Sequence, residues 1–135
     1  MSNLRIFVSI TIAIIFFSCK KDSVAQPFND LLRSGSWTIS AYVNEFVLDT
    51  SINYTGYTLD FHSDGKMQVQ SITDSGNGTW ETSDTDGRIF MLIDLEDDFP
   101  SLEGKWDVLT MTNTQIELSA GGGLSTYTFM TLIKN

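Results

Sequence analysis

The sequence is poor in the residues that most catalytic and metal sites use. Its 135 residues include one cysteine, Cys19, and one histidine, His62. A single cysteine excludes an intramolecular disulfide, and this pair cannot supply the three or four nitrogen and sulfur ligands of a zinc site. His62 falls on the polar side of its segment, so no nucleophile has a candidate base. We therefore expect no catalytic residues, no metal and no cofactor.

Basic residues and prolines are also scarce. The chain has 8 Lys and Arg against 17 Asp and Glu, which gives a formal net charge of −9 at pH 7. An acidic surface repels phosphate backbones, which argues against a nucleic-acid partner, and it offers no basic patch for anionic lipids. Two prolines and 41% hydrophobic residues are typical of a packed globular domain.

An apolar run near the start of the chain is too short to span a bilayer. Residues 6–17 follow Arg5 and contain only Ser9 and Thr11 as polar interruptions. About 20 apolar residues are needed to cross a membrane. The order of a charged start and a short apolar run is typical of a secretory signal peptide. A plain signal peptide, or an anchor helix, followed by an incidental cysteine is the alternative to the interpretation that the next residues favour.

The residues that end this run, Phe16-Phe17-Ser18-Cys19, resemble the lipobox of bacterial lipoproteins. With the lysines that follow, they look like the lipoprotein starts common in Bacteroidetes. The resemblance implies that signal peptide 1–18 is removed and that Cys19 is lipidated and acylated. Acyl chains would then hold the protein stably on a membrane, with residues 19–26 as a tether. The expected location is the cell envelope, on the outer membrane, facing either the periplasm or the cell surface.

The rest of the chain, residues 27–135, reads as one domain of β-strands after a short helix. Residues 27–33 predict the helix, with Pro27 in its first turn and Gly35 beyond its end. From Trp37 onward the hydrophobic period is two, which places Ile39, Ala41 and Val43 on the same buried face as Trp37. Eight strands are expected, at 37–44, 57–62, 66–73, 78–82, 88–95, 105–110, 114–119 and 126–133.

Short turns separate many of these strands. Asp64-Gly65 and Asp86-Gly87 are strong hairpin signals, and residues 75–78 predict a slightly longer hairpin loop. Short links make consecutive strands antiparallel neighbours. Eight such strands favour an up-and-down barrel, because closure removes the exposed edges. A two-sheet sandwich is the alternative.

Three connections are longer, at residues 46–55, 96–104 and 120–125. They follow the first, fifth and seventh strands, so alternation of strand direction brings all three to one end of the barrel. Functional loops often lie on such rims. The acidic residues 94–98 fit a solvated part of this rim, although calcium binding there stays open.

The order of motifs resembles the small lipocalin-like domains of Bacteroidetes lipoproteins. Gly35-Ser36-Trp37 resembles the Gly-X-Trp motif at the start of a lipocalin barrel, and residues 59–67, 78–80 and 106–119 extend the likeness. The resemblance covers about residues 34–134. It implies an eight-stranded up-and-down barrel and leaves the ligand unassigned.

The aromatic residues supply the candidate interior. A small eight-stranded barrel is either filled by side chains or holds one small ligand. We expect a membrane-anchored, non-enzymatic protein that binds a small hydrophobic or amphipathic ligand at the open barrel end. The alternative is a filled barrel that serves as a protein-interaction module of the cell envelope. The candidate interior residues are Trp37, Tyr57, Phe61, Trp80, Met91, Trp106, Tyr127 and Phe129, whereas the apolar residues expected on the outer side are Leu92, Leu109, Met130 and Leu132.

Overall fold

The computed structural model describes residues 25–44, 53–121 and 127–135. The predicted signal peptide, the lipidation of Cys19 and the first part of the tether lie outside these residues. Helix α1, Ala25–Arg33, begins two residues before the predicted start.

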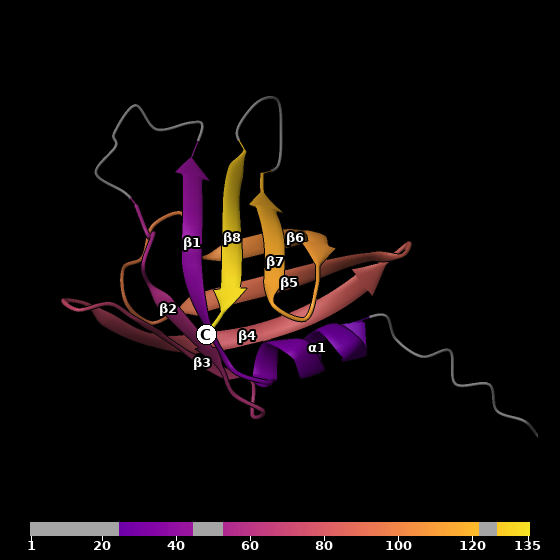
Figure 1. Cartoon of the computed structure of the whole chain (residues 1–135), viewed down its shortest axis with the longest axis horizontal. Coiled ribbons are helices and arrows are strands. Elements are labelled where there is room, and N and C mark those ends of the chain that lie inside the picture. The colour runs from indigo at the N-terminus through magenta and orange to yellow at the C-terminus, as the bar shows by residue number, and fades with distance from the viewer. Residues whose placement is uncertain (1–24, 45–52, 122–126) are drawn as a thin grey trace, which may run out of the picture.

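Eight strands form one closed antiparallel barrel, which confirms the predicted fold (Figure 1). Each strand pairs with its neighbours in the chain, and the last strand returns to pair with the first. The two-sheet sandwich is therefore excluded. The strands are β1 Ser36–Asn44, β2 Thr58–Phe61, β3 Lys66–Gln70, β4 Ser75–Thr85, β5 Arg88–Leu95, β6 Gly104–Met111, β7 Gln115–Ala120 and β8 Thr128–Lys134.

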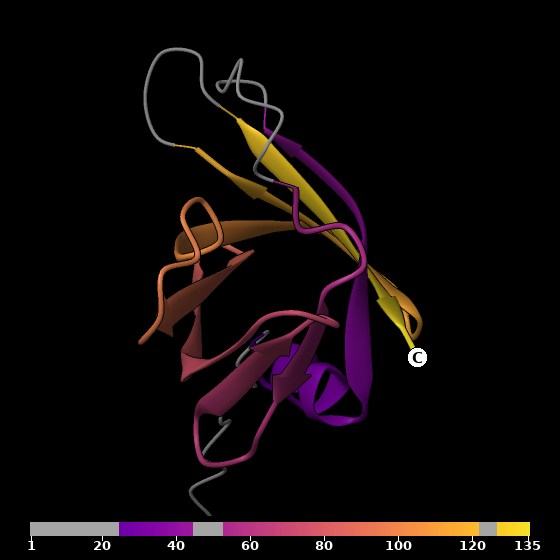
Figure 2. The same ribbon diagram turned by 90° about the vertical axis from the view of Figure 1, so that its left-hand side faces the viewer.

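Helix α1 packs across the barrel end at which β1 begins, at the bottom of Figures 1 and 2. Phe28 and Leu32 lie one helical turn apart and are both completely buried. Residues four apart share one face of a helix, so this face seals the barrel. The indole Nε1 of Trp37 donates a hydrogen bond to the carbonyl oxygen of Leu32 at 3.1 Å. The helix is thus fixed to the first strand by both packing and hydrogen bonding.

Apolar side chains fill the middle of the barrel. Trp37 and Trp106 are its largest completely buried side chains, and both have zero exposed surface. A void large enough for a water molecule would leave accessible surface on the side chains that line it. Trp37 and Trp106 therefore line no such void. The same zero exposure is found for Ile39, Leu59, Val69, Met91, Ile116 and Leu132.

A β-bulge in β1 changes which of its residues face inward. The register with β8 shifts between Ile39 and Ala41, so Ser40 is an extra residue. A bulge reverses the alternation beyond it. Tyr42 is therefore buried, whereas Val43 is 53% exposed. The prediction that Ala41 and Val43 share the buried face of Trp37 was wrong for this reason.

Strand β8 also faces the opposite way from the prediction. Met130 and Leu132 are buried, whereas Phe129 is 38% exposed and Tyr127 is 49% exposed. Phe129 pairs in register with Val43, so both side chains lie on the outer face. The two aromatic residues therefore do not belong to the interior, and the two aliphatic ones do.

The turn between β3 and β4 comes before the glycines that were expected to form it. The amide of Ser71 donates to the carbonyl of Asp74 at 2.7 Å, which closes the turn there. Gly76 and Gly78 lie inside β4 and face inward. A Cβ on Gly76 would come 2.3 Å from the ring of Phe99. Glycine is needed here for close packing, which is a common reason for glycine within a strand.

Candidate functional site

The structure does not gather the candidate interior residues into one pocket. Five of them are buried in the barrel: Trp37, Phe61, Trp80, Met91 and Trp106. Tyr57 is half-buried beside the loops at the end opposite α1, and Tyr127 and Phe129 lie outside. The five buried residues are packing elements of a filled core.

The β5–β6 loop closes the end of the barrel that lies opposite α1. Its Phe99 is 6% exposed, and Leu102 is completely buried. The indole Nε1 of Trp106 donates to the carbonyl oxygen of Leu102 at 2.9 Å, and Glu103 accepts a hydrogen bond from the amide of Leu95 at 3.2 Å. The loop therefore acts as a plug and not as a free rim.

Two tyrosine hydroxyls tie this loop to the rest of the barrel end. Tyr42 donates to the carbonyl of Ser101 at 3.0 Å, and Tyr54 donates to the carbonyl of Pro100 at 2.7 Å. Ser101 has a φ of 67°, in the left-handed region that costs a non-glycine residue about 1 kcal/mol or more. The two hydrogen bonds flank this position and help to hold it.

Four aromatic rings pack together beneath the loop. Tyr54 is central: its ring lies 5.1 Å from that of Tyr42 and 5.3 Å from that of Tyr57, with both pairs nearly perpendicular. Phe99 completes the cluster, with its ring 6.3 Å from that of Tyr57. Edge-to-face pairs of this kind stabilise by about 0.5–1.5 kcal/mol each beyond their burial. The cluster gives this end a rigid wall.

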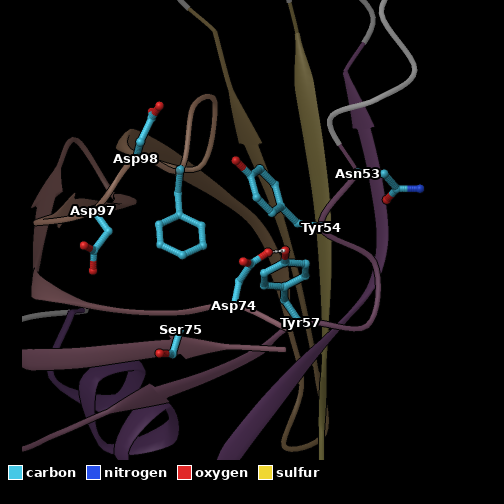
Figure 3. A pocket seen from close by; sticks show the side chains of 8 residues that line it. Asn53, Tyr54, Tyr57, Asp74, Ser75, Asp97 and Asp98 are labelled. Carbon is cyan, nitrogen blue, oxygen red and sulfur yellow. Dashed lines mark hydrogen bonds between the residues drawn. The ribbon is translucent and has the colours of Figure 1, made fainter. Parts of the chain in front are cut away.

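A pocket of about 350 Å³ opens beside this wall and is called the mouth pocket below. Figure 3 shows Asp97 and Asp98 across the pocket from Tyr54 and Tyr57, with Asp74 joined to Tyr57. Among the residues that the structure describes, no lysine, arginine or histidine lines it. The lining residues are Asn53, Tyr54, Tyr57, Asp74, Ser75, Asp97, Asp98 and Phe99.

Burial and nearby carboxylates both raise the pKa values of the tyrosines that line the mouth pocket. Tyr57 donates a hydrogen bond to Asp74 at 2.9 Å, and this bond raises the pKa of the Tyr57 hydroxyl. Burial is the largest cause that raises the pKa of Tyr54, and its neighbours Tyr42, Tyr57, Asp98 and Glu103 raise it further. Negative charge disfavours a tyrosinate. The same negative charge favours a positively charged guest.

The mouth pocket combines residues from the β1–β2, β3–β4 and β5–β6 connections. The sequence predicted that long loops 46–55, 96–104 and 120–125 share one end, and the first two of them contribute described residues to the pocket, whereas the third contributes none. The described parts of two of them, residues 53–57 and 96–103, meet through Tyr54 and Phe99. The aromatic wall itself was missed. Its signal was the presence of Tyr54 and Phe99 within segments that otherwise read as loops, where exposed aromatic rings are unusual. Among the described residues, no three His, Cys, Asp or Glu side chains are grouped to hold a metal ion.

Comparison with known proteins shows the fold alone. No family model matches the chain, and no curated protein matches its sequence. A solved structure, that of a DUF4847 family protein from Bacteroides vulgatus, matches with a TM-score of 0.54 over 80% of this chain and 97% of the other. The two sequences are 13% identical, so the match shows a shared barrel fold. In the described part of the chain, no helix is long and apolar enough to cross a membrane.

Proposed function

We propose that the protein is a lipid-anchored, non-enzymatic binding protein of the cell envelope. Its proposed ligand is a small amphipathic molecule that carries a positive charge and binds in the mouth pocket. The observation that carries this proposal is the rigid aromatic wall of Tyr54, Tyr57 and Phe99, which lines the pocket together with three carboxylates and with no cationic side chain from the described part of the chain.

Because side chains fill the core, we place the binding site at the end of the barrel and not along its axis. Trp37, Met91 and Trp106 have no exposed surface, so a ligand would have to displace them to enter. The mouth pocket needs no such displacement. Aromatic faces attract cations by about 0.5–2 kcal/mol, and nearby carboxylates add to this attraction. An apolar part of the ligand would pack on the half-buried ring of Tyr57.

A set of three probes with one ring and different charges tests the ligand class. Benzyltrimethylammonium, benzyl alcohol and benzoate are titrated into the chain from residue 19 onward carrying Cys19→Ser, by calorimetry at low salt. We expect saturable binding of the cation, weaker binding of the alcohol and no binding of benzoate. Added salt should weaken binding of the cation, because exposed charges are screened.

Removing two carboxylates from the mouth pocket should weaken binding of the cation. For Asp97→Asn/Asp98→Asn we expect a loss of about thirtyfold, from about 1 kcal/mol for each of the two charges close to the ligand in water. Asp84→Asn/Asp86→Asn is the matched control, because it removes the same charge at the opposite end of β4. Equal losses in both double variants would mean that net charge, not the pocket, attracts the probe.

The lipid anchor has a direct test in the full chain. Cys19→Ser should move the protein from the membrane fraction to the soluble fraction, since acyl chains supply about 0.8 kcal/mol per buried methylene. Mass spectrometry of the unaltered protein should show an acylated residue 19 as the new N-terminus. A Cys19→Ser protein that stays in the membrane would instead indicate an uncleaved anchor helix.

A second function, docking on another protein of the envelope, is favoured by one observation. Val43 and Phe129 pair in register on the outer face, and Tyr127 stacks on Phe129 with a ring distance of 6.1 Å. Exposed apolar patches of this kind often mark interaction surfaces. The titration separates the two functions, because a pure interaction module has no reason to bind benzyltrimethylammonium.

A further inference from the structure

We infer a second binding site on the outer wall of the barrel, at the seam between β5 and β6, for an amphipathic anion. The ligand class is a carboxylate joined to an aliphatic chain. The site is separate from the mouth pocket and opposite to it in charge.

The seam opens because the two strands diverge. Pairing between β5 and β6 covers only residues 90–93 of β5 and residues 104–107 of β6. Beyond Asp107, β6 continues to Met111 and pairs only with β7. Arg88 and Ile89 of β5 have no β6 partner in register. A hollow of about 380 Å³ lies along this unpaired stretch.

The seam hollow has apolar walls that reach the solvent. Leu109 is 50% exposed, and Met111 is 39% exposed. The register with β7 shifts between Val108 and Thr110, so Leu109 is an extra residue at a bulge. Bulges re-aim side chains and end regular pairing. Ile89 and Val108 also line the hollow, which makes its wall mainly aliphatic.

A second hollow of about 580 Å³ adjoins the seam and holds the positive charge. Lys105 places its Nζ 3.9 Å from the centre of the Phe90 ring, and the Cζ of Arg88 lies 5.5 Å from the same centre. Arg88 pairs with Asp107, whereas Lys105 forms no ion pair with any described residue. The Lys105 ammonium group is therefore free to meet an anion.

These cations stand out in an acidic chain. The described residues contain only five Lys and Arg, and two of them line this one hollow. Tyr127 lines it as well, 49% exposed. Concentrating positive charge beside aromatic rings, on a protein with a formal net charge of −9, favours an anionic ligand locally.

The two hollows meet at one ion pair, which sets the orientation of the ligand. Arg88 and Asp107 line both hollows. A carboxylate bound to Lys105 would lie beside Arg88, and its chain would run past the ion pair into the seam along Leu109 and Met111. The head group and the chain are thus recognised by different parts of β6, with Arg88 of β5 beside the head group.

Hexanoate, heptanoate and octanoate test this site, with octanol and octylammonium as head-group controls. All are titrated into the Cys19→Ser chain from residue 19 onward, which contains every described residue. We expect saturable binding of the carboxylates, with affinity rising by up to about fourfold for each added methylene. Octanol and octylammonium should bind more weakly than octanoate.

Two variants separate the head group from the chain. Lys105→Gln should weaken octanoate binding about fivefold at low salt, whereas Lys66→Gln, which removes the same charge from β3, should have no effect. Leu109→Asn should flatten the dependence on chain length, and its thermal melting curve would show that the barrel is intact. Asp97→Asn/Asp98→Asn should not weaken octanoate binding, so failure here is distinguishable from failure at the mouth pocket.

The proposal would be overturned by any of three results. The first is octanoate binding that does not saturate. The second is equal octanoate affinity in Lys105→Gln and Lys66→Gln. The third is that, in NMR spectra of the isotope-labelled protein, octanoate shifts the backbone amide signals of the mouth pocket instead of those of residues 88–90 and 105–111.

Discussion

Replacing Trp106 by alanine should lower the free energy of unfolding by about 3–5 kcal/mol, the usual range for a buried tryptophan. Trp106 is completely buried, and its indole also donates to the carbonyl of Leu102 in the loop that plugs the barrel. The substitution therefore leaves a cavity in the core and frees the plug. Urea unfolding followed by circular dichroism measures the change.

Trp106→Phe is the matched variant, because it keeps an aromatic ring and loses the indole donor. It should cost less than the alanine variant, with about 1 kcal/mol or more from the hydrogen bond alone. A loss below about 1 kcal/mol for Trp106→Ala would contradict a filled core, since side chains that line an open cavity contribute less packing.

Replacing Gly78 by alanine should be nearly as damaging, for the opposite physical reason. A Cβ at this position would lie 2.1 Å from the carbonyl oxygen of Asp94 and 2.9 Å from the Cα of Leu95. These are backbone atoms of β5, so they cannot move aside without opening the β4–β5 pairing. We expect a loss of about 3 kcal/mol or more, at the upper end of overpacking costs.

Asn77→Ala is the control for Gly78→Ala, because Asn77 is the adjacent residue of β4 and its side chain is exposed. It should change stability by no more than about 0.5 kcal/mol. Thermal melts of both proteins make the comparison. If Gly78→Ala has the same melting temperature as the native protein, β4 and β5 cannot approach each other as closely as described.

The fold was predictable because its signals are local. Alternating residues around Trp37 and the Asp64-Gly65 turn are enough to indicate strands and their antiparallel order. The bulge at Ser40 has no such signal, since it depends on the register with β8. This is why Val43 was placed on the wrong side. Phe129 was misplaced for another reason, because β8 carries apolar residues on both faces and alternation alone does not show which face is buried.

The candidate site was only partly predictable, because its parts come together through the closed barrel. The acidic residues of the β5–β6 loop were recognised as lying at the loop-bearing end. Their position opposite Tyr54 and Tyr57 depends on how far Phe99 and Leu102 reach into the barrel. The sequence pattern also predicted Gly76 and Gly78 to lie in a turn. The structure instead requires glycine at these positions because Gly76 lies close to the ring of Phe99 and Gly78 lies close to the backbone of β5.

Backbone amide shifts of the isotope-labelled domain, measured during titration with benzyltrimethylammonium, distinguish binding in the mouth pocket from binding inside the barrel. We predict saturable shifts at residues 53–57, 74–75 and 97–99, with the signals of Trp37, Met91 and Trp106 unchanged. Saturable shifts at those three core residues, with the pocket residues unaffected, would show that the ligand enters the barrel and that the mouth pocket is not the binding site.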